Sequence, residues 1–344
     1  MTPRLGIDAT YALDPQPTGV AVYSQRLLRG LAGRHSGARY RWFYRPHRFR
    51  QSFAESLPSG AGRRLLWDPL VRGVDLFHGL NQRLPKRRGA WRTVVTFHDL
   101  FVMTAEYSTA DFRARFTALA REAAAAADAI IAVSAFTAGQ VRDLLGVEPA
   151  RVHVIPHGVD PVAPASAGAR EKLILHVGAI QKRKNLARLV DAFAATPPGW
   201  RLLLAGGSGY GSEEVLAAIQ RSPRRADIET PGYLTPEELD RAWSRASIFA
   251  FPSLDEGFGM PVLEAMARGV PVLTSTSSAL PEAAGGAAQL VDPGSTEVIA
   301  AALVDLCQNE AKRAALVAAG LRRVQSAGWD AAVDATWRVY QSLL

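Results

Sequence analysis

Short apolar runs alternate with longer stretches of helical periodicity from one end of the chain to the other. The short runs have the length and β-branched content of buried strands, whereas the longer stretches repeat apolar residues every three or four positions. The expected strands are residues 5–7, 40–44, 76–78, 94–97, 129–133, 152–155, 172–177, 201–205, 246–251, 270–275 and 288–291. The expected helices include residues 19–31, 109–127, 185–195, 237–243 and 296–326. This strand–helix alternation predicts an α/β fold of parallel sheets covered by helices on both faces.

The alternation is interrupted near the middle of the chain. Residues 160–169 are rich in Pro, Ala and Gly and lack an apolar period, which is typical of a hinge linker. The length of 344 residues also favours two domains over one. We therefore expect Rossmann-like domains at residues 1–165 and 166–326, followed by a terminal helix at 327–344. Their strand ends would face a central cleft, where ligands bind in such sheets.

Composition excludes several classes of protein. Because 48% of the residues are hydrophobic, the chain is not disordered as a whole. No apolar run reaches the ~18–20 residues that cross a bilayer. The single cysteine, Cys307, cannot form an internal disulfide or a cysteine-based zinc site. Since the N-terminus leads directly into an expected strand, we expect no signal peptide and a cytoplasmic protein.

The positive charge lies in the first half of the chain. Residues 1–165 contain 22 Lys and Arg against 13 Asp and Glu, whereas the rest contains 18 against 19. A one-sided basic field attracts anionic partners such as nucleic acid, an acidic membrane or a phosphorylated acceptor. Arginine-rich coding bias explains why 35 of the 40 cationic residues are Arg, but not why they are unevenly distributed.

Basic and aromatic residues alternate in one stretch of this half. The stretch contains Arg39, Arg41, Arg45, Arg48 and Arg50, interspersed with Tyr40, Trp42, Phe43, Tyr44 and Phe49. A second basic stretch covers residues 83–92. Both suit a membrane interface with anionic lipid or a pyrophosphate-linked lipid acceptor. The alternative is an edge strand at 40–44 with arginines on its solvent-exposed face.

Two polar positions follow expected strands of the first half. Gly19 opens the first long helix, where its bare backbone could approach an anion, although a plain turn explains it as well. His98 follows the strand at 94–97, so it could hydrogen-bond a substrate hydroxyl or could be a satisfied structural histidine.

Three consecutive cations precede a helix in the second half. Lys182, Arg183 and Lys184 lie where the helix dipole prefers anions. A bound phosphate would resolve this conflict, because the cations and the helix N–H groups would both point at it. A solvated basic loop is the alternative.

The run EGFGMPVLE at residues 256–264 is the candidate site with the most specific sequence pattern. Gly257 and Gly259 have no side chains to cover the backbone N–H groups at the start of a helix, and two carboxylates flank them. Glu264 lies about one turn into that helix, where it could accept both vicinal hydroxyls of a ribose. Glu256 lies in the loop, within reach of a sugar hydroxyl. The alternative, a Glu favoured by the helix dipole, accounts for one carboxylate but not for the glycine pair.

The chain contains no Asp-x-Asp triplet and no metal-ligand spacing of His, Asp or Glu. It also contains no Walker A loop and no nucleophile elbow. We therefore expect no metal and no cofactor, with an anion held by Lys, Arg and backbone dipoles.

The sequence resembles glycosyltransferase family 4, the retaining GT-B group, over essentially its full length. The matching motifs are residues 232–234, 246–253, 256–272, 279–282 and 291–293 in the second half, and 6–9, 18–19, 97–99 and 155–160 in the first. Gly328 and Trp329 precede a last helix that, in this fold, crosses back onto the first domain.

The resemblance implies a nucleotide-sugar donor and a set of site residues. Glu264 would bind the donor ribose, and Glu256 with Gly257, Phe258, Gly259 and Met260 would hold the donor sugar. Lys184 with Arg183 would neutralise the departing diphosphate, although the sequence leaves open which two of Lys182, Arg183 and Lys184 act. Gly19 would lie under the diphosphate, His98 would face the donor sugar, and Tyr233 with Leu234 would border the nucleobase.

The resemblance also implies the reaction. No nucleophile for a covalent intermediate is evident, so we expect front-face attack by the acceptor hydroxyl with retention of configuration. The opening motif is similar to that of mannosyltransferases that build surface polysaccharides, which favours GDP-mannose as donor and a saccharide or lipid-linked saccharide as acceptor.

Other activities stay open at this stage. The chain could use a UDP-sugar instead, or be a nucleotide-sugar epimerase or a phosphorylase with the same two-domain cleft. A nucleic-acid-binding protein would use the basic first half, but no recognised binding module is present, so we expect no nucleic-acid partner.

Overall fold

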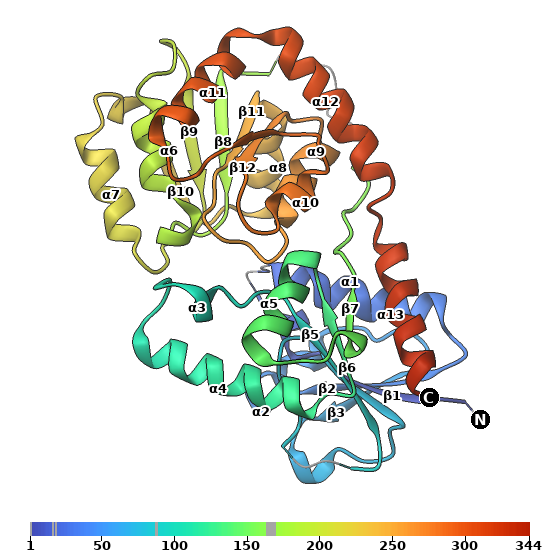
Figure 1. Cartoon of the computed structure of the whole chain (residues 1–344). Coiled ribbons are helices and arrows are strands. Elements are labelled where there is room, and N and C mark those ends of the chain that lie inside the picture. Colours follow the sequence, from blue (N-terminus) through green and yellow to red (C-terminus); the bar gives the residue numbers. More distant parts are fainter. Residues whose placement is uncertain (1, 16, 18, 87–88, 163–169) are drawn as a thin grey trace. The chain divides into compact units, whose positions relative to one another are not determined.

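The computed structural model describes residues 2–15, 17, 19–86, 89–162 and 170–344. The core of the predicted linker, Thr18 and two arginines of the second basic stretch lie outside these residues. The chain forms two compact units (Figure 1). The first contains residues 1–104, 109–158 and 328–344, and the second contains residues 105–108 and 159–327.

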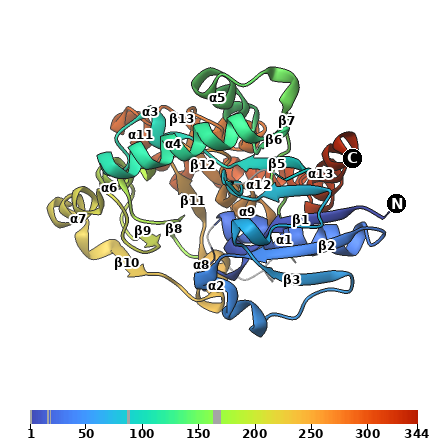
Figure 2. The same cartoon turned by 90° about the horizontal axis from the view of Figure 1, so that it is seen from below.

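The first unit is built on a seven-stranded parallel sheet in the order β3-β2-β1-β4-β5-β6-β7. Its strands are β1 (Arg4–Asp8), β2 (Arg39–Tyr44), β3 (Ala61–Leu65), β4 (Leu76–Gly79), β5 (Arg92–Phe97), β6 (Ala129–Ala132) and β7 (Val152–Val154). Its helices are α1 (Gly19–Arg34), α2 (Pro46–Phe49), α3 (Phe101–Thr104), α4 (Ala110–Ala126), α5 (Ala135–Leu145) and α13 (Trp329–Leu343). Figure 2 shows β1, β2 and β3 side by side.

Alternating side chains of these strands bury against helices on opposite faces of the sheet. Val95 and Phe97 pack with the alanines of α4 and with α5. Thr96, between them in β5, points to the other face and hydrogen-bonds Tyr23 of α1 at 2.9 Å. The two-residue period of a strand therefore serves two helical layers, as predicted.

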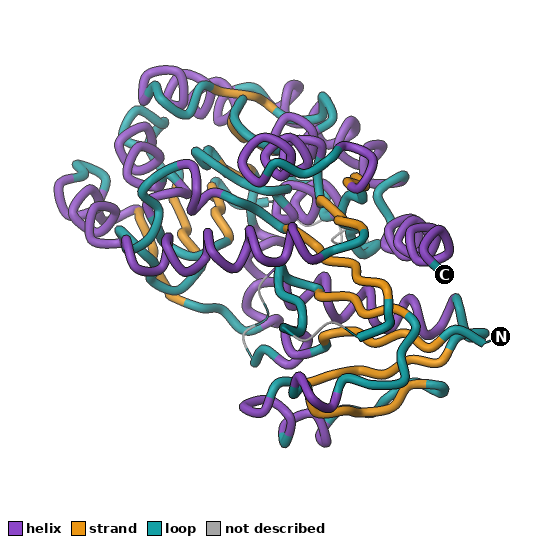
Figure 3. Tube along the Cα trace, turned by 60° about the horizontal axis from the view of Figure 1, so that its bottom comes forward, coloured by secondary structure: helices purple, strands orange, loops and turns teal. Residues whose placement is uncertain are grey.

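The second unit contains a six-stranded parallel sheet in the order β10-β9-β8-β11-β12-β13. Its strands are β8 (Leu173–Val177), β9 (Arg201–Ala205), β10 (Ile228–Gly232), β11 (Ile248–Phe251), β12 (Val272–Ser275) and β13 (Gln289–Val291). Its helices are α6 (Leu186–Phe193), α7 (Ser212–Arg221), α8 (Pro236–Arg245), α9 (Met260–Ala267), α10 (Leu280–Ala284), α11 (Thr296–Gln308) and α12 (Glu310–Gln325). Figure 3 shows the strands of each unit between helical layers. The predicted α/β fold with parallel sheets is confirmed.

Three expectations about single elements are wrong. Strands β3 and β10 were not expected, because AGRRL and IETPG lack a continuous apolar run. As β3 pairs with β2, the stretch 40–44 is not an edge strand. The helix expected at 296–326 is two helices, since the side chain of Asn309 accepts a hydrogen bond from Lys312 N at 2.9 Å and starts a new helix.

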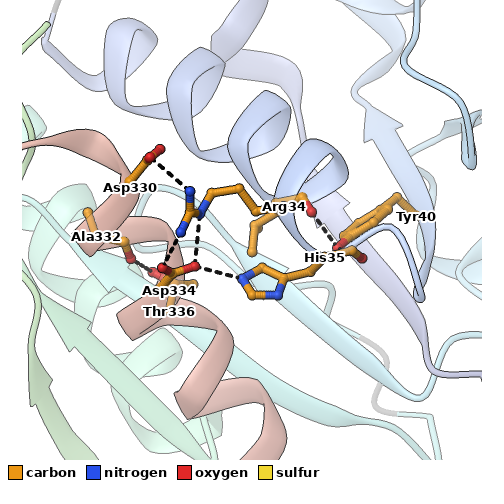
Figure 4. Close-up of polar contacts among 8 residues, drawn as sticks. Arg34, His35, Tyr40, Asp330, Ala332, Asp334 and Thr336 are labelled. Atoms are coloured by element: carbon orange, nitrogen blue, oxygen red, sulfur yellow. Dashed lines mark hydrogen bonds and ion pairs between the residues drawn. The ribbon is translucent and has the colours of Figure 1, made fainter.

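Helix α13 packs on α1 within the first unit, so the predicted return of the last helix to the first domain is confirmed. Arg34 contacts Asp330 at 2.8 Å and Asp334 at 2.6 Å, and His35 Nε2 lies 3.0 Å from Asp334 (Figure 4). Deeper in the unit, His78 Nδ1 lies 2.6 Å from the Tyr340 hydroxyl. The helix is thus held by exposed ion pairs and by a buried hydrogen bond.

Candidate active site

The strand order of the second unit reverses between β8 and β11, which are parallel neighbours. The loops that follow these two strands therefore begin side by side at the carboxyl edge of the sheet. This position is where open α/β sheets bind ligands. The loop after β8 carries the three predicted cations, and the loop after β11 carries Glu256.

Two of the predicted cations and the predicted carboxylate form a buried triad. Lys184 Nζ lies 2.6 Å from Glu256 Oε1, and Arg183 Nη1 lies 2.8 Å from Glu256 Oε2. All three residues are at most 8% exposed. Lys184 Nζ also lies 4.4 Å from the ring centre of Phe251. Lys182, by contrast, is half-exposed and pairs with Glu214 at 3.6 Å, so the structure separates it from the other two cations.

The triad carries one more positive than negative charge. Burial alone would raise the pKa of Glu256, but the charges of Arg183 and Lys184 lower the pKa of this carboxyl to about 2. Glu256 is therefore ionised at neutral pH and contacts both cations. Two buried cations next to a sheet edge are suited to an anionic ligand such as a diphosphate.

Backbone contacts hold both loops in place. Asn185 adopts a left-handed conformation with φ 61°, and its amide donates to Pro252 O at 3.1 Å and to Pro293 O at 2.8 Å. The Arg183 guanidinium donates to the carbonyl of Asp255. Glu256 N donates to the Ser278 hydroxyl at 2.9 Å. The cations and the carboxylate are thus oriented by bonds between the two loops and to the loops that follow β12 and β13, which favours a preorganised site.

The second carboxylate and the glycines lie at the start of α9. Gly259 precedes the helix with φ 99°, and a Cβ there would meet Leu280 Cδ2 at 2.7 Å, so only glycine fits without strain. No side chain caps this helix. Glu264 lies in its second turn and is partly buried, and burial raises the pKa of its carboxyl against the opposing charge of Arg268. Phe258 is buried, and Met260 begins the helix.

His176 is a site residue that the sequence analysis missed. It lies on β8, where its Nδ1 is 3.0 Å from Ala250 O and its Nε2 is buried without a hydrogen-bond partner among the described residues. Burial and, to a smaller extent, the charge of Lys184 lower its pKa to about 3, so the imidazole is neutral. Within the run LILHV a histidine resembles a core residue, and only its place before the cationic loop could have drawn attention to it.

Tyr233 and Leu234 follow β10, the edge strand of the same sheet. Tyr233 is 45% exposed, so its ring is available to a planar group. Strands β9 and β8 separate β10 from β11. The pair therefore lies at the far end of the carboxyl edge from the loop that carries Glu256.

Gly19 and His98 belong to the first unit. Gly19 is exposed at the first position of α1. His98 is buried, and its Nε2 donates to Leu80 O at 2.8 Å while its Nδ1 lies 3.4 Å from His157 Nε2. Burial lowers the pKa of His98 to about 4. Both nitrogens are thus engaged within the protein, and the ring is neutral at pH 7.

Four of the five aromatic residues of the basic stretch are part of the core, and the fifth, Phe49, is half-buried. Tyr40, Trp42, Phe43 and Tyr44 are at most 5% exposed. They therefore cannot form the exposed aromatic band that a membrane interface uses, which removes the original reason for expecting one. Among the described residues, no helix is long and apolar enough to cross a membrane, and no group of three or more His, Cys, Asp or Glu side chains could hold a metal ion.

Solved structures share the complete fold. Sucrose-phosphate synthase from Thermosynechococcus elongatus aligns with a TM-score of 0.79 at 22% identity, covering 100% of this chain and 99% of that one. Anabaena HepE, solved in complex with UDP and glucose, aligns with a TM-score of 0.73 at 18% identity over 100% of both chains. These likenesses show that the two units have the GT-B fold.

Sequence comparisons define the family. The model for "Glycosyltransferase Family 4" matches residues 17–162, and the model for "Glycosyl transferases group 1" matches residues 164–323. O-antigen chain mannosyltransferase B of Escherichia coli is 30% identical over 78% of this chain and 74% of its own length. D-inositol 3-phosphate glycosyltransferase of Kineococcus radiotolerans is 33% identical over 63% of this chain, and the match spans 57% of that protein. The chain belongs to glycosyltransferase family 4, and it is a glycosyltransferase.

Proposed function

We propose that the enzyme transfers mannose from GDP-mannose to a saccharide or lipid-linked saccharide acceptor, with retention of the anomeric configuration. The buried triad of Arg183, Lys184 and Glu256 carries this proposal, because it places two cations and a carboxylate at the switch point of one sheet. Glu264, in the same unit, would bind the ribose of the donor. Tyr233 would lie against the nucleobase.

The two cations act on the leaving group. When the donor enters, its diphosphate competes with Glu256 for Lys184 and Arg183, and this frees the carboxylate to accept a hydroxyl of the sugar. The bond between the anomeric carbon and the β-phosphate oxygen breaks, and the acceptor oxygen bonds to that carbon on the same face. The proton of the acceptor hydroxyl passes to the departing phosphate oxygen. Fixed charges that stabilise such a leaving group contribute on the order of 10²–10³ in rate each.

The reaction would need no metal, because Lys184 and Arg183 supply the positive charge beside the diphosphate. We expect the rate to be unchanged after treatment with EDTA, measured as nucleotide release in the presence of acceptor. Loss of activity that added magnesium or manganese restores would contradict this part of the proposal.

Mannose is favoured by the E. coli relative, which is named a mannosyltransferase. A UDP-sugar is the second candidate, since HepE was solved with UDP. Thermal unfolding with GDP, UDP and ADP distinguishes the two, because only the bound nucleotide raises the melting temperature. We expect the largest rise with GDP, and the Glu264→Ala variant should lose it.

Turnover tests the activity itself. GDP-mannose incubated with acceptor should give an α-linked product. The one-bond carbon–hydrogen coupling at the anomeric carbon, measured by NMR, identifies this linkage. Incubation with donor alone should leave the nucleotide-sugar unchanged. An interconverted sugar in the absence of acceptor would instead indicate an epimerase, and a trapped covalent glycosyl-enzyme would contradict front-face attack.

We also propose a cytoplasmic enzyme that contacts an anionic membrane surface peripherally through the first unit. The support is its basic charge together with exposed Phe53 and Trp67, which are 65% and 60% exposed. Co-sedimentation with phosphatidylglycerol vesicles at low and moderate salt tests this contact. Absence of binding at low salt would rule it out.

A further inference from the structure

In the second unit, the missing side chain of Gly178 leaves a small space directly after β8. Gly178 adopts φ 144°, a backbone conformation that favours glycine. A Cβ at this position would lie 3.5 Å from His176 Nε2, 3.5 Å from Lys184 Cε and 3.7 Å from Lys184 Nζ. An imidazole nitrogen and the ammonium of the triad therefore border the same space.

The hydrogen bond on the other side of the ring fixes the tautomer of His176. Its Nδ1 lies 3.0 Å from Ala250 O, and a carbonyl oxygen only accepts, so Nδ1 carries the proton. Burial lowers the pKa of His176 to about 3, so the ring is neutral at pH 7 and Nε2 has a lone pair. His176 is 0% exposed, and this Nε2 has no hydrogen-bond partner among the described residues. A buried acceptor without a donor is unfavourable and therefore requires an explanation.

Aromatic contacts hold the imidazole and the ammonium against one side chain. The ring of His176 is stacked beside that of Phe251, with centres 5.4 Å apart and planes inclined by 13°. The ammonium of Lys184 lies 4.4 Å from the centre of the same Phe251 ring. Because β8 and β11 are paired, both contacts are part of the rigid sheet. His176 Nε2 is thus a preorganised acceptor next to the lysine.

A neutral acceptor differs from Glu256 in its effect on the charge of Lys184. In the structure Lys184 Nζ lies 2.6 Å from Glu256 Oε1, and the carboxylate opposes the charge of the ammonium. In the proposed reaction the diphosphate displaces Glu256, so the lysine loses this partner. An imidazole lone pair can orient the ammonium without cancelling its charge, which leaves the full charge to act on the leaving group.

We propose that His176 is a positioning residue for Lys184: when a diphosphate displaces Glu256, the ammonium moves toward the space beside Gly178 and donates a hydrogen bond to His176 Nε2. This inference rests on the proposed function, since it concerns the lysine assigned there to the leaving group. The ammonium keeps its proton, because the buried imidazole is a much weaker base than a lysine amine. The bare nitrogen of His176 thereby obtains a donor in the state that reacts.

Nitrogen NMR of protein with isotope-labelled histidine tests the hydrogen bond itself. The resonance of His176 Nε2 is assigned by its absence in His176→Phe, or in His176→Asn if the first variant does not fold. Saturating GDP or UDP, whichever stabilises the protein, should shift this resonance toward that of a hydrogen-bonded nitrogen, and Lys184→Met should abolish the shift. A resonance that the nucleotide leaves unchanged, or that shifts equally in Lys184→Met, would overturn the proposal.

A double-mutant cycle tests the role of the hydrogen bond in the reaction. His176→Phe keeps a ring beside Phe251 but lacks the acceptor, so kcat should fall about tenfold with little change in KM. In the Lys184→Met background the same substitution should have no further effect, because the lysine that it positions is absent. Additive losses would overturn the proposal. An unchanged kcat together with a lower melting temperature would also overturn it, since His176 would then serve only the core.

The matched control for altered packing is Trp243→Phe. Trp243 is 1% exposed and packs on Phe249, with ring centres 5.0 Å apart, two residues before Phe251 in the same strand. The substitution disturbs the aromatic packing of β11 but removes no polar atom from the space beside Gly178. We expect a lower melting temperature and an unchanged kcat. A fall in kcat equal to that of His176→Phe would show that packing alone sets the rate and would overturn the proposal.

The same measurements separate this inference from the proposed function. A protein that no nucleotide stabilises and that transfers no sugar would contradict the proposed function. A reduced rate in Lys184→Met together with a normal rate in His176→Phe would instead overturn the positioning role alone.

Discussion

Substitution of Lys184 should lower the rate of catalysis with little change in stability, whereas substitution of Glu256 should lower the stability of the protein. The buried triad has two cations and one carboxylate, so its members are not equivalent. Lys184→Met leaves Glu256 with Arg183, one charge of each sign. Glu256→Gln instead removes the carboxylate between two buried cations. The first variant leaves the triad with equal numbers of positive and negative charges, and the second leaves it with two cations and no carboxylate.

The magnitudes follow from the geometry. A carboxyl pKa lowered from 4.5 to about 2 corresponds to about 3 kcal/mol of stabilisation for the ionised form of Glu256. Breaking a buried ion pair typically costs about 3–5 kcal/mol, so Glu256→Gln should lose about 3 kcal/mol or more. Lys184→Met keeps the methylene chain near Phe251 and should change stability by about 1 kcal/mol at most. Its rate should fall on the order of 10²–10³-fold, because one cation at the leaving diphosphate is lost.

Urea unfolding at pH 7.5 and initial rates with the nucleotide-sugar identified above measure the two effects. Arg221→Met serves as the control, since Arg221 is exposed in the last turn of α7 and lies outside the triad and its supporting contacts. A Lys184→Met variant that unfolds more easily than Glu256→Gln would refute the charge-balance argument. A near-normal rate in Lys184→Met would refute the assignment of this lysine to the leaving group.

Further expectations concern the glycine turn, the buried histidines and the last helix. Gly259→Ala should destabilise the protein by about 1–3 kcal/mol, because φ 99° is unfavourable for alanine and the new Cβ would lie 2.7 Å from Leu280 Cδ2. Thermal unfolding measures this loss, and an unchanged melting temperature would contradict the expectation. Burial lowers the pKa of His78 and His176 to about 3, so both are neutral in the folded protein, whereas the unfolded chain protonates them near pH 6.5. Stability should therefore fall as pH drops below 6.5, by up to about 1.4 kcal/mol per pH unit for each histidine, and equal urea midpoints at pH 7.5 and 5.5 would refute this. Tyr340→Phe removes the buried hydrogen-bond partner of His78 and should lower the free energy of unfolding by about 1–3 kcal/mol. Asp334→Asn affects a half-exposed ion pair and should lower it by about 1 kcal/mol or less. A larger loss of stability in Asp334→Asn than in Tyr340→Phe would contradict this order.

The sequence predicted every central strand of both sheets and the edge strands β7 and β13. Runs such as AIIA and IFAF are apolar throughout, because a strand with helices on both faces buries every side chain. The strands that were missed, β3 and β10, are edge strands with arginines or a proline, and only their pairing with a neighbour makes them strands. Tertiary context similarly moved four aromatic residues of the basic stretch from an expected membrane face into the core.

The cations and the glycine–glutamate run of the candidate donor site could be identified singly, because local pattern marks them, whereas His176 could not. Cations before a helix and a glycine pair between two glutamates are anomalies within a few residues of sequence. The contact between Lys184 and Glu256, 72 residues apart, could not be identified in this way. It arises because β8 and β11 are adjacent in the sheet, and strand order is a long-range property.

The sequence by itself determined the fold class, the elements buried at its centre and the residues capable of binding a diphosphate, because these depend on local periodicity and local charge. Only the tertiary structure decided that Glu256 lies between two cations and that His176 and Lys184 border the same space. These juxtapositions depend on which strands become neighbours, and burial against distant segments sets that choice rather than any single stretch of chain.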